Sequence, residues 1–195
     1  MGFWWRFDII NFDCYYSVMI YFVRHGETEY NRQGRVQGHL DIPLNAKGIS
    51  QAEQAREVCK DKAIHLIYCS PLQRAKKTAE IINEYHNVEV VVDKRLIELY
   101  SGSVQGKTIK ECTEEELKYA FNKPEKNNGE SLPDFFKRVK ESYDDILALN
   151  KNVLIVSHGG VYRALYKIAN NIDGFDLEIE TPKNAEVIEI KKHAN

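Results

Sequence analysis

Two short apolar segments, far apart in the chain, each end in a histidine followed by glycine. They are residues 19–25 (MIYFVRH) and residues 153–158 (VLIVSH). Runs of this length predict β-strands, and side chains at the carboxyl ends of strands gather where open α/β sheets bind ligands. A single histidine after a strand is commonly a hydrogen-bonded loop residue, but the repetition indicates that both histidines serve one site.

The first segment joins an arginine to its histidine, and this pair suits phosphoryl chemistry. The planar guanidinium of Arg24 matches two phosphate oxygens, and a neutral imidazole at His25 can attack the phosphorus held there. His158 can then stabilise the charge of that group. We therefore expect a phosphohistidine, with the other ring nitrogen of His25 donating to a group that the sequence does not identify.

Two segments between the histidines provide a second group to bind the phosphoryl group and an acid to protonate the leaving oxygen. The sequence SPLQRA predicts a helix start, with Ser70 as N-cap and Pro71 as the first helical residue, and helix N-termini favour anions. Arg74 falls on the first turn and is expected to hold the phosphoryl group with the arginine of the first strand. Glu98 lies in a loop punctuated by glycine and is expected to protonate the departing oxygen.

In this order, the segments resemble the motifs of the histidine phosphatase superfamily, which includes cofactor-dependent phosphoglycerate mutases and many phosphomonoesterases. The resemblance covers residues 19 to about 190. It is carried by RHGETEYN (24–31), RVQGHLDIPLNAKG (35–48), SPLQRAKKTA (70–79), LIE (96–98), GES (129–131) and SHGG (157–160). It implies a phosphoglycerate mutase-like fold, catalysis through a phosphohistidine, and no cofactor.

The resemblance also implies which residues act. The catalytic set is Arg24, His25, Arg74, Glu98 and His158. The groups that bind the phosphorylated substrate are Arg24, Asn31, Gln37, Gly38, Arg74, His158 and Gly159. Glu27 and Glu29 are alternative acids, but Glu27 precedes Thr28 in a turn and is expected rather to accept structural hydrogen bonds.

Strand-length apolar runs alternate with amphipathic helical patterns, which predicts a three-layer α/β/α sandwich with a mostly parallel central sheet. The strands are expected at 20–23, 64–69, 88–92, 153–156 and 187–190. One helix is expected to begin near 45 or 50, a second to run from 71 to about 85, and others to include 135–147 and 161–169. In the first helix, the residues expected to face the core are Ile49, Ala52, Ala55, Val58 and Cys59.

One domain accounts for residues 19–195, with a short helical cover at about 107–130. Residues 1–18 match nothing in the family and form an N-terminal extension. It is either of little consequence or an aromatic segment that contacts a partner or a membrane surface. Charged residues interrupt its apolar run, so it is not expected to span a membrane.

Composition excludes several classes of protein. The 195 residues carry a formal net charge of −2, so the chain has no electrostatic reason to bind nucleic acid. Its four cysteines show no C-x-x-C spacing, so neither a zinc ribbon nor a redox pair is indicated. We expect a cytoplasmic protein, a monomer or a homodimer, that acts on a small phosphorylated substrate.

Two rival functions have weaker support. A metal hydrolase would need grouped ligands, but the chain has no H-E-x-x-H sequence and two arginines would repel the cation, so no metal is expected. The histidines concerned are His25, His39, His65, His86 and His158. A module that binds a phosphorylated ligand without turnover is expected to lack at least one catalytic residue, and all are present.

Phosphatase and mutase are closer competitors, because both pass through a phosphohistidine. A mutase must hold a bisphosphate, which requires extra basic and aromatic residues around the second phosphate. Ser101 and Ile109 stand where the mutase loop has Tyr and Lys, and Leu99 stands where it has Arg, although Gln105 is mutase-like. The stretch 107–129 is also too short for the mutase insertion, so a phosphatase is favoured. Candidates for the leaving-group side are Tyr100, Tyr119, Phe121 and Lys123.

Overall fold

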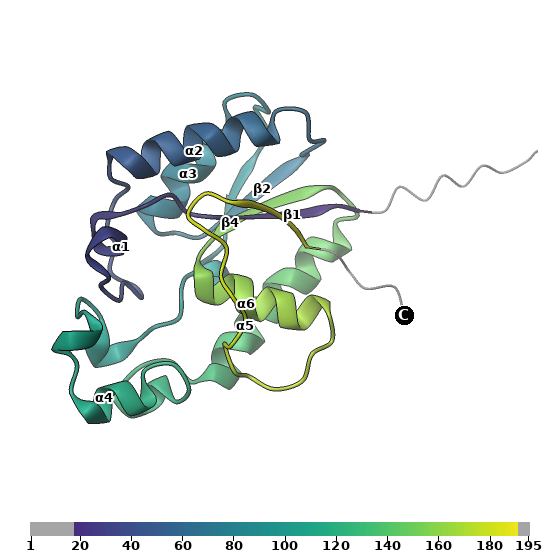
Figure 1. The fold of residues 1–195 in the computed structure, drawn as a ribbon. Coiled ribbons are helices and arrows are strands. Elements are labelled where there is room, and N and C mark those ends of the chain that lie inside the picture. The colour runs from purple at the N-terminus through teal and green to yellow at the C-terminus, as the bar shows by residue number, and fades with distance from the viewer. Residues whose placement is uncertain (1–17, 191–195) are drawn as a thin grey trace, which may run out of the picture.

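A five-stranded sheet forms the centre of the protein (Figure 1). The computed structural model describes residues 18–190, so the predicted extension, apart from Val18, lies outside the described residues. In spatial order the strands are β3 (Val90–Val92), β2 (Leu66–Cys69), β4 (Val153–Ser157), β1 (Ile20–Arg24) and β5 (Val187–Ile190). β5 runs antiparallel to β1, and the other neighbouring strands are parallel. The predicted mostly parallel sheet is confirmed.

Helices cover both faces of this sheet (Figure 1). On one face lie α2 (Ala46–Cys59) and α3 (Gln73–Asn83), and on the other lie α5 (Leu132–Ala148) and α6 (Gly159–Ala169). Successive side chains of β1 alternate between the two cores: Ile20 and Phe22 pack with residues of α5 and α6, whereas Tyr21 and Val23 pack with residues of α2 and α3. The three-layer α/β/α sandwich is therefore confirmed.

The apolar stripe of α2 is narrower than the sequence predicts. Ala52, Ala55 and Cys59 are buried as expected. The expectation that Ile49 and Val58 face the core is wrong, because they are 39% and 60% exposed. Only small residues of α2 are buried in the core, and its two larger apolar side chains are exposed at the surface.

Ser70 does not cap the next helix, although its place before Pro71 predicts that it should. α3 starts only at Gln73, and its N-cap residue makes no side-chain hydrogen bond. The Ser70 hydroxyl instead lies 2.7 Å from His158 Nε2, and Asp41 Oδ1 accepts a hydrogen bond of 2.7 Å from the Gln73 amide. The prediction is wrong because distant partners replace the local cap.

Short helices occupy the long connections. α1 (Glu29–Gln33) follows β1, and η1 (Lys94–Leu96) follows β3. η2 (Gly102–Val104) precedes the predicted cover at about 107–130, and that stretch contains η3 (Ile109–Glu111), α4 (Glu114–Tyr119) and η4 (Pro124–Asn127). In Figure 1 this stretch lies beside the sandwich, on the same side as α1. Among residues 18–190, no helix is long and apolar enough to cross a membrane.

Two glycines let the loop after β1 pack directly on the start of α2. A side-chain carbon on Gly48 would lie 2.0 Å from the Glu27 carbonyl oxygen, and one on Gly26 would lie 2.3 Å from the Gly48 carbonyl oxygen. The Asn45 amide donates a hydrogen bond of 2.9 Å to the same Glu27 carbonyl. This close backbone approach fixes the loop that carries His25.

Gly48→Ala should therefore destabilise the protein, although alanine is normally better than glycine inside a helix by about 1 kcal/mol. The new methyl group would push α2 away from the Glu27 carbonyl. Gly34→Ala is the matched control: Gly34 has a φ of 67°, but no atom lies within 4 Å of the added carbon, so only backbone strain of about 1–2 kcal/mol is introduced. Thermal unfolding should show the larger drop in Tm for Gly48→Ala. A Tm at or above that of the wild type would contradict the close packing.

Candidate active site

The carboxyl ends of three neighbouring strands meet at one edge of the sheet. His25 follows β1, Ser70 follows β2 and His158 follows β4. Because β4 lies between β2 and β1 and pairs its Ser157 with Arg24, the two histidines emerge side by side. Their ring centroids are 5.2 Å apart. The structure thus brings together the two histidines that the sequence predicts to share a site.

A backbone carbonyl fixes the tautomer of His25. Nδ1 lies 2.7 Å from the carbonyl oxygen of Gly26. A carbonyl can only accept a hydrogen bond, so Nδ1 carries the hydrogen and the lone pair remains on Nε2. The group that the sequence leaves unidentified is therefore the carbonyl of the next residue. Gly26 is itself tied down, since its amide donates to Thr78 Oγ1 at 3.1 Å.

His158 is buried, and among residues 18–190 only one of its ring nitrogens has a hydrogen-bond partner. Nε2 lies 2.7 Å from Ser70 Oγ. That hydroxyl accepts a hydrogen bond of 3.3 Å from the Leu72 amide, and Nε2 is the one acceptor for its own hydrogen within residues 18–190, so we assign that hydrogen to the bond with Nε2. Nδ1 then carries the ring hydrogen, and no described residue accepts it. His158 can therefore offer Nδ1–H to a bound anion.

Backbone carbonyls, and not carboxylates, hold the two arginines. Arg24 Nη1 donates to the Pro182 carbonyl at 3.0 Å. Arg74 donates from Nη1 to the Leu40 carbonyl at 2.7 Å and from Nη2 to the Gly38 carbonyl at 2.9 Å. The Nε–H group of each arginine is buried without an acceptor in the described part of the chain. Both Nη groups of Arg74 thus hold a loop, and its Nε–H is left without a partner among the described residues.

Both histidines are kept neutral by their surroundings. Burial is the main cause that lowers the pKa of His25 and of His158 well below the usual value, and the charges of Arg74 and Arg24 lower it further. Burial also lowers the pKa of Arg74, to about 10, so its guanidinium remains charged at neutral pH. A neutral nucleophile beside buried positive charge is the arrangement that attack on a phosphate dianion requires.

Backbone amides orient the Glu98 carboxyl group. Oε1 accepts a hydrogen bond from the Leu99 amide at 2.9 Å, and Oε2 accepts one from the Gly160 amide at 3.3 Å. A side-chain carbon on Gly160 would lie 2.4 Å from Glu98 Oε1, so the second glycine after His158 makes room for this carboxyl group. Gly159 and Gly160 also begin α6, whose N-terminus adds positive potential at this edge.

The alternative acids have partners elsewhere. Glu27 accepts hydrogen bonds from Asn45 Nδ2 at 3.0 Å and from Lys47 Nζ at 2.7 Å. Glu29 pairs with Arg32 one turn further along α1, at the surface. The geometry agrees with the structural role expected of Glu27.

A cavity of about 260 Å³ contains most of the expected site residues. Those that line it are Arg24, His25, Asn31, Gln37, Gly38, Arg74, Glu98 and Gly159. Asn31 Oδ1 accepts a hydrogen bond from the Thr28 amide at 3.1 Å, which leaves the amide hydrogens of Asn31 for a ligand. His158 is not among the lining residues, and it joins the site through its ring contact with His25.

Several other lining residues are absent from the predicted site residues, among them Arg163, Leu177 and Thr181. Arg163 lies four residues after Gly159 on α6, hence on the same helix face, and that spacing is a signal that could have found it. Its Nε donates to the Ile179 carbonyl at 2.6 Å. Leu177 and Thr181 come from the connection between α6 and β5, where no local pattern marks them.

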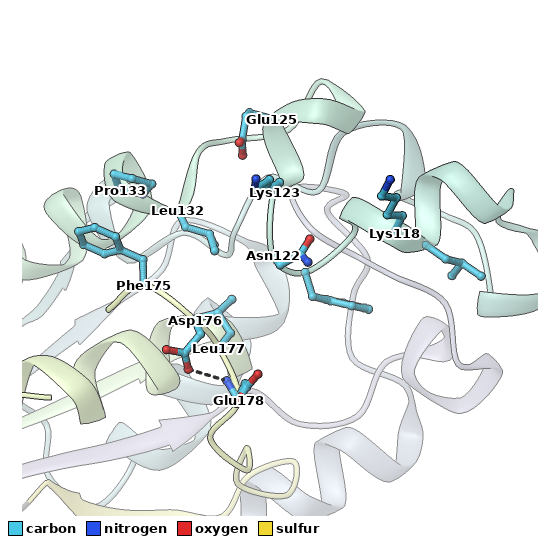
Figure 2. Close-up of a pocket in the computed structure, with 12 residues that line it drawn as sticks. Lys118, Asn122, Lys123, Glu125, Leu132, Pro133, Phe175, Asp176, Leu177 and Glu178 are labelled. Carbon is cyan, nitrogen blue, oxygen red and sulfur yellow. Dashed lines mark hydrogen bonds between the residues drawn. The ribbon is translucent and has the colours of Figure 1, made fainter. Parts of the chain in front are cut away.

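A groove of about 540 Å³ adjoins the cavity (Figure 2). It runs between the stretch around α4 and η4 and the loop that follows α6 (Figure 2). Phe121 and Leu177 line both the groove and the cavity. Lys123 lines the groove as expected of a residue on the leaving-group side, but Tyr100 and Tyr119 line neither space.

The histidines considered as metal ligands have other contacts. His39 Nε2 donates to the Glu98 carbonyl at 2.7 Å, and His65 Nδ1 accepts a hydrogen bond of 3.3 Å from the Asn152 amide. Across residues 18–190, no three His, Cys, Asp or Glu side chains are grouped so that they could hold a metal ion.

Comparison with known families agrees with this geometry. The model of the histidine phosphatase superfamily (branch 1) matches residues 20–195. The chain belongs to the histidine phosphatase superfamily. Within this superfamily, the chain is 39% identical to the uncharacterized phosphatase PhoE of Bacillus subtilis, over 83% of this chain and 80% of the relative.

Other relatives bear names of two kinds, phosphoglycerate mutase and phosphatase. The chain is 37% identical to the probable phosphoglycerate mutase GpmB of Salmonella arizonae, over 73% of this chain and 70% of the relative. The solved structure of a mycobacterial glucosyl-3-phosphoglycerate phosphatase matches with a TM-score of 0.79 at 28% identity, covering 89% of this chain and 90% of that one. The phosphatases among these relatives support a phosphoric monoester hydrolase.

NMR spectroscopy of the histidine rings tests this electrostatic account. At about pH 6, ¹⁵N spectra should show His25 neutral, with hydrogen on Nδ1 and none on Nε2, and His158 neutral as well. An exposed histidine, with a pKa of about 6.5, is mostly protonated at that pH. Because the unfolded chain takes up protons at these histidines below about pH 6.5 and the folded chain does not, the free energy of unfolding should fall as the pH decreases. An imidazolium at either position at pH 6 would contradict the account.

Proposed function

We propose that the protein is a metal-independent phosphomonoesterase that hydrolyses small phosphorylated metabolites through a phosphohistidine on His25. One observation carries the proposal. Arg24 Nε, Arg74 Nε and His158 Nδ1 are buried without a hydrogen-bond acceptor among the described residues. Buried donors are nearly always paired, so three from one site indicate a ligand that accepts several hydrogen bonds. A phosphoryl group, with three equatorial oxygens, is such a ligand.

In the first half-reaction, His25 Nε2 attacks the phosphorus. A nitrogen–phosphorus bond forms while the bond from phosphorus to the leaving oxygen breaks. The three buried donors stabilise the charge that is spread over the equatorial oxygens. Glu98 gives its proton to the leaving oxygen, which departs as an alcohol.

In the second half-reaction, water attacks the phosphohistidine. Glu98, now ionised, accepts a proton from the water as the new oxygen–phosphorus bond forms. The nitrogen–phosphorus bond breaks, its electron pair returns to Nε2, and inorganic phosphate leaves. Throughout, the Gly26 carbonyl accepts the hydrogen bond from Nδ1 and so stabilises the positive charge of the phosphorylated ring.

The shape of the site supports a small substrate. The cavity of about 260 Å³ has room for a phosphoryl group and a modest leaving group. A larger leaving group would extend past Phe121 and Leu177, which line both spaces, into the adjoining groove. There Leu132 and Pro133 provide apolar surface and Lys123 a positive charge (Figure 2).

A phosphoglycerate mutase is the second candidate, because a relative bears that name at 37% identity. The position expected to be Tyr in a mutase is Ser101, which lines the cavity, and the position expected to be Lys is Ile109, which is 50% exposed and outside it. Besides Arg24 and Arg74, two cations line the cavity. Arg35 is paired with Glu111 at 2.7 Å, and Arg163 donates from Nε to the Ile179 carbonyl at 2.6 Å. Interconversion of 3- and 2-phosphoglycerate faster than phosphate release would favour the mutase.

His25→Ala should abolish release of phosphate from p-nitrophenyl phosphate, because the nucleophile is lost. A chelator should leave the wild type fully active. His65→Ala is the control, since this exposed histidine lies away from the cavity and its loss should leave activity unchanged. Activity that a chelator removes and a divalent cation restores would contradict the proposal and favour a metal hydrolase.

Glu98→Gln keeps the shape of the acid but removes its proton, and it leaves one oxygen to accept the two backbone hydrogen bonds from the Leu99 and Gly160 amides. The value of kcat/KM reports transfer of the phosphoryl group to His25 and not the later hydrolysis, in which Glu98 also acts. For an alkyl phosphate such as glycerol phosphate, kcat/KM should fall by ~10²–10⁴, the usual contribution of general acid catalysis. For p-nitrophenyl phosphate, kcat/KM should fall much less, because a nitrophenolate leaves without protonation. Glu29→Gln, at the surface, should change neither value. Equal losses of kcat/KM for both substrates in Glu98→Gln would show that Glu98 is not the acid.

A further inference from the structure

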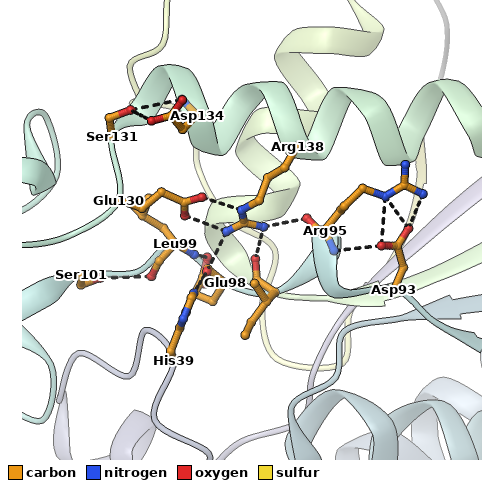
Figure 3. A network of polar contacts seen from close by, with 11 residues as sticks. His39, Asp93, Arg95, Glu98, Leu99, Ser101, Glu130, Ser131, Asp134 and Arg138 are labelled. Carbon is orange, nitrogen blue, oxygen red and sulfur yellow. Dashed lines mark hydrogen bonds and ion pairs between the residues drawn. The ribbon is translucent and has the colours of Figure 1, made fainter.

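One arginine outside the cavity uses every hydrogen of its guanidinium (Figure 3). Arg138 on α5 donates from Nε and Nη2 to the two carboxylate oxygens of Glu130, at 2.6 and 2.8 Å. Its Nη1 donates to the carbonyls of Arg95 and Ile97, at 2.6 and 2.7 Å, and its Nη2 also donates to the Glu98 carbonyl at 3.0 Å. A guanidinium has five N–H groups, and all five have acceptors here.

The three carbonyls belong to the segment that carries the proposed acid. Residues 97–101 form no helix or strand, so no regular hydrogen-bond ladder fixes the backbone at Glu98. Arg138 binds the carbonyls of Glu98 and of the residue before it, and His39 Nε2 adds a second hydrogen bond to the Glu98 carbonyl. The planar guanidinium of Arg138 therefore fixes the backbone at Glu98, where no helix or strand does so.

Glu130 fixes the guanidinium in turn. The ion pair is bidentate, and both side chains are only 18% exposed, which favours one geometry. The Arg138 guanidinium also lies over the Phe135 ring, 4.8 Å from its centroid. The Glu130 amide donates to the Tyr100 carbonyl at 2.8 Å, so the pair joins the acid segment to the chain that leads into α5.

We propose that Arg138, oriented by Glu130, is a positioning residue for the acid step: it holds the backbone around Glu98 so that the carboxyl group reaches the leaving oxygen. The proposal rests on the proposed phosphomonoesterase. Arg138 does not line the cavity and has no N–H left for a substrate. Its loss should therefore affect proton transfer to the leaving group and spare phosphoryl binding.

The test compares Arg138→Met with Arg138→Lys and Glu130→Gln. For each variant, kcat/KM is measured with glycerol phosphate and with p-nitrophenyl phosphate, together with inhibition by inorganic phosphate and Tm. Arg95→Met is the matched control. Arg95 lies in the same segment, but its side chain pairs with Asp93 (Figure 3) and with Asp145.

Arg138→Met should lower kcat/KM for glycerol phosphate by ~10–100-fold, because a displacement of about 1 Å can cost that much. The value for p-nitrophenyl phosphate and the inhibition by phosphate should change little. Lysine, with three donors, should restore part of the loss, and Glu130→Gln should cause a smaller loss in the same direction. Arg95→Met should leave the ratio of the two kcat/KM values unchanged.

A double mutant separates positioning from general stability. In the Glu98→Gln background, Arg138→Met should not change the substrate ratio further, because the acid is already absent. Equal losses for both substrates in the single mutants would overturn the proposal, as would a further change of the ratio in that background. If Arg138→Met does not fold, Glu130→Gln decides by the same criteria. A ratio that Glu98→Gln leaves unchanged would instead contradict the proposed acid.

Discussion

The site depends on the burial of positive charge without a carboxylate partner. Arg24 and Arg74 are held by carbonyls of Pro182, Leu40 and Gly38, and neither forms an ion pair within residues 18–190. Burying unpaired charge is costly, and neutral dipoles offset only part of that cost. Burial is the main cause that lowers the pKa of the neighbouring imidazoles, and these charges lower it further, so one arrangement would both attract a phosphoryl group and prepare the proposed nucleophile.

Strand pairing makes this arrangement possible. The register that places Arg24 opposite Ser157 sets the two histidines beside each other, and β2 brings Ser70 within hydrogen-bond distance of His158. Glycines then let backbones approach where side chains would collide, between Gly26 and α2 and between Gly160 and the Glu98 carboxyl group. The precision of the site thus comes from the sheet and from these close contacts.

Local sequence signals predict the strands, the layers of the fold and the positions of the two histidines. Apolar runs mark the five strands of the sheet, and the His-Gly pairs mark the ends of β1 and β4. Each of these signals lies within a few neighbouring residues, so it can be recognised without knowledge of the fold. β2 and β3 are shorter than predicted, at Leu66–Cys69 and Val90–Val92. The alternating order of strands and helices then predicts the layers and the parallel sheet.

What the sequence could not predict depends on contacts between distant segments. The partner of Ser70 lies 88 positions away, and the carbonyls held by Arg138 lie about 40 positions before it. A serine before proline has the same local sequence whether it caps a helix or binds a histidine. Leu177 and Thr181 line the cavity from an irregular connection, where neither periodicity nor capping places a side chain.

The central claim is that His25 is the nucleophile and that its reactive atom is Nε2, since Nδ1 is held by the Gly26 carbonyl. Rapid quenching in base during turnover of a phosphomonoester, followed by phosphopeptide mapping and ³¹P NMR spectroscopy, measures both points at once. The account predicts an acid-labile phosphoryl group on Nε2 of His25. Phosphate on Nδ1, on another residue, or on no residue while turnover proceeds would contradict it.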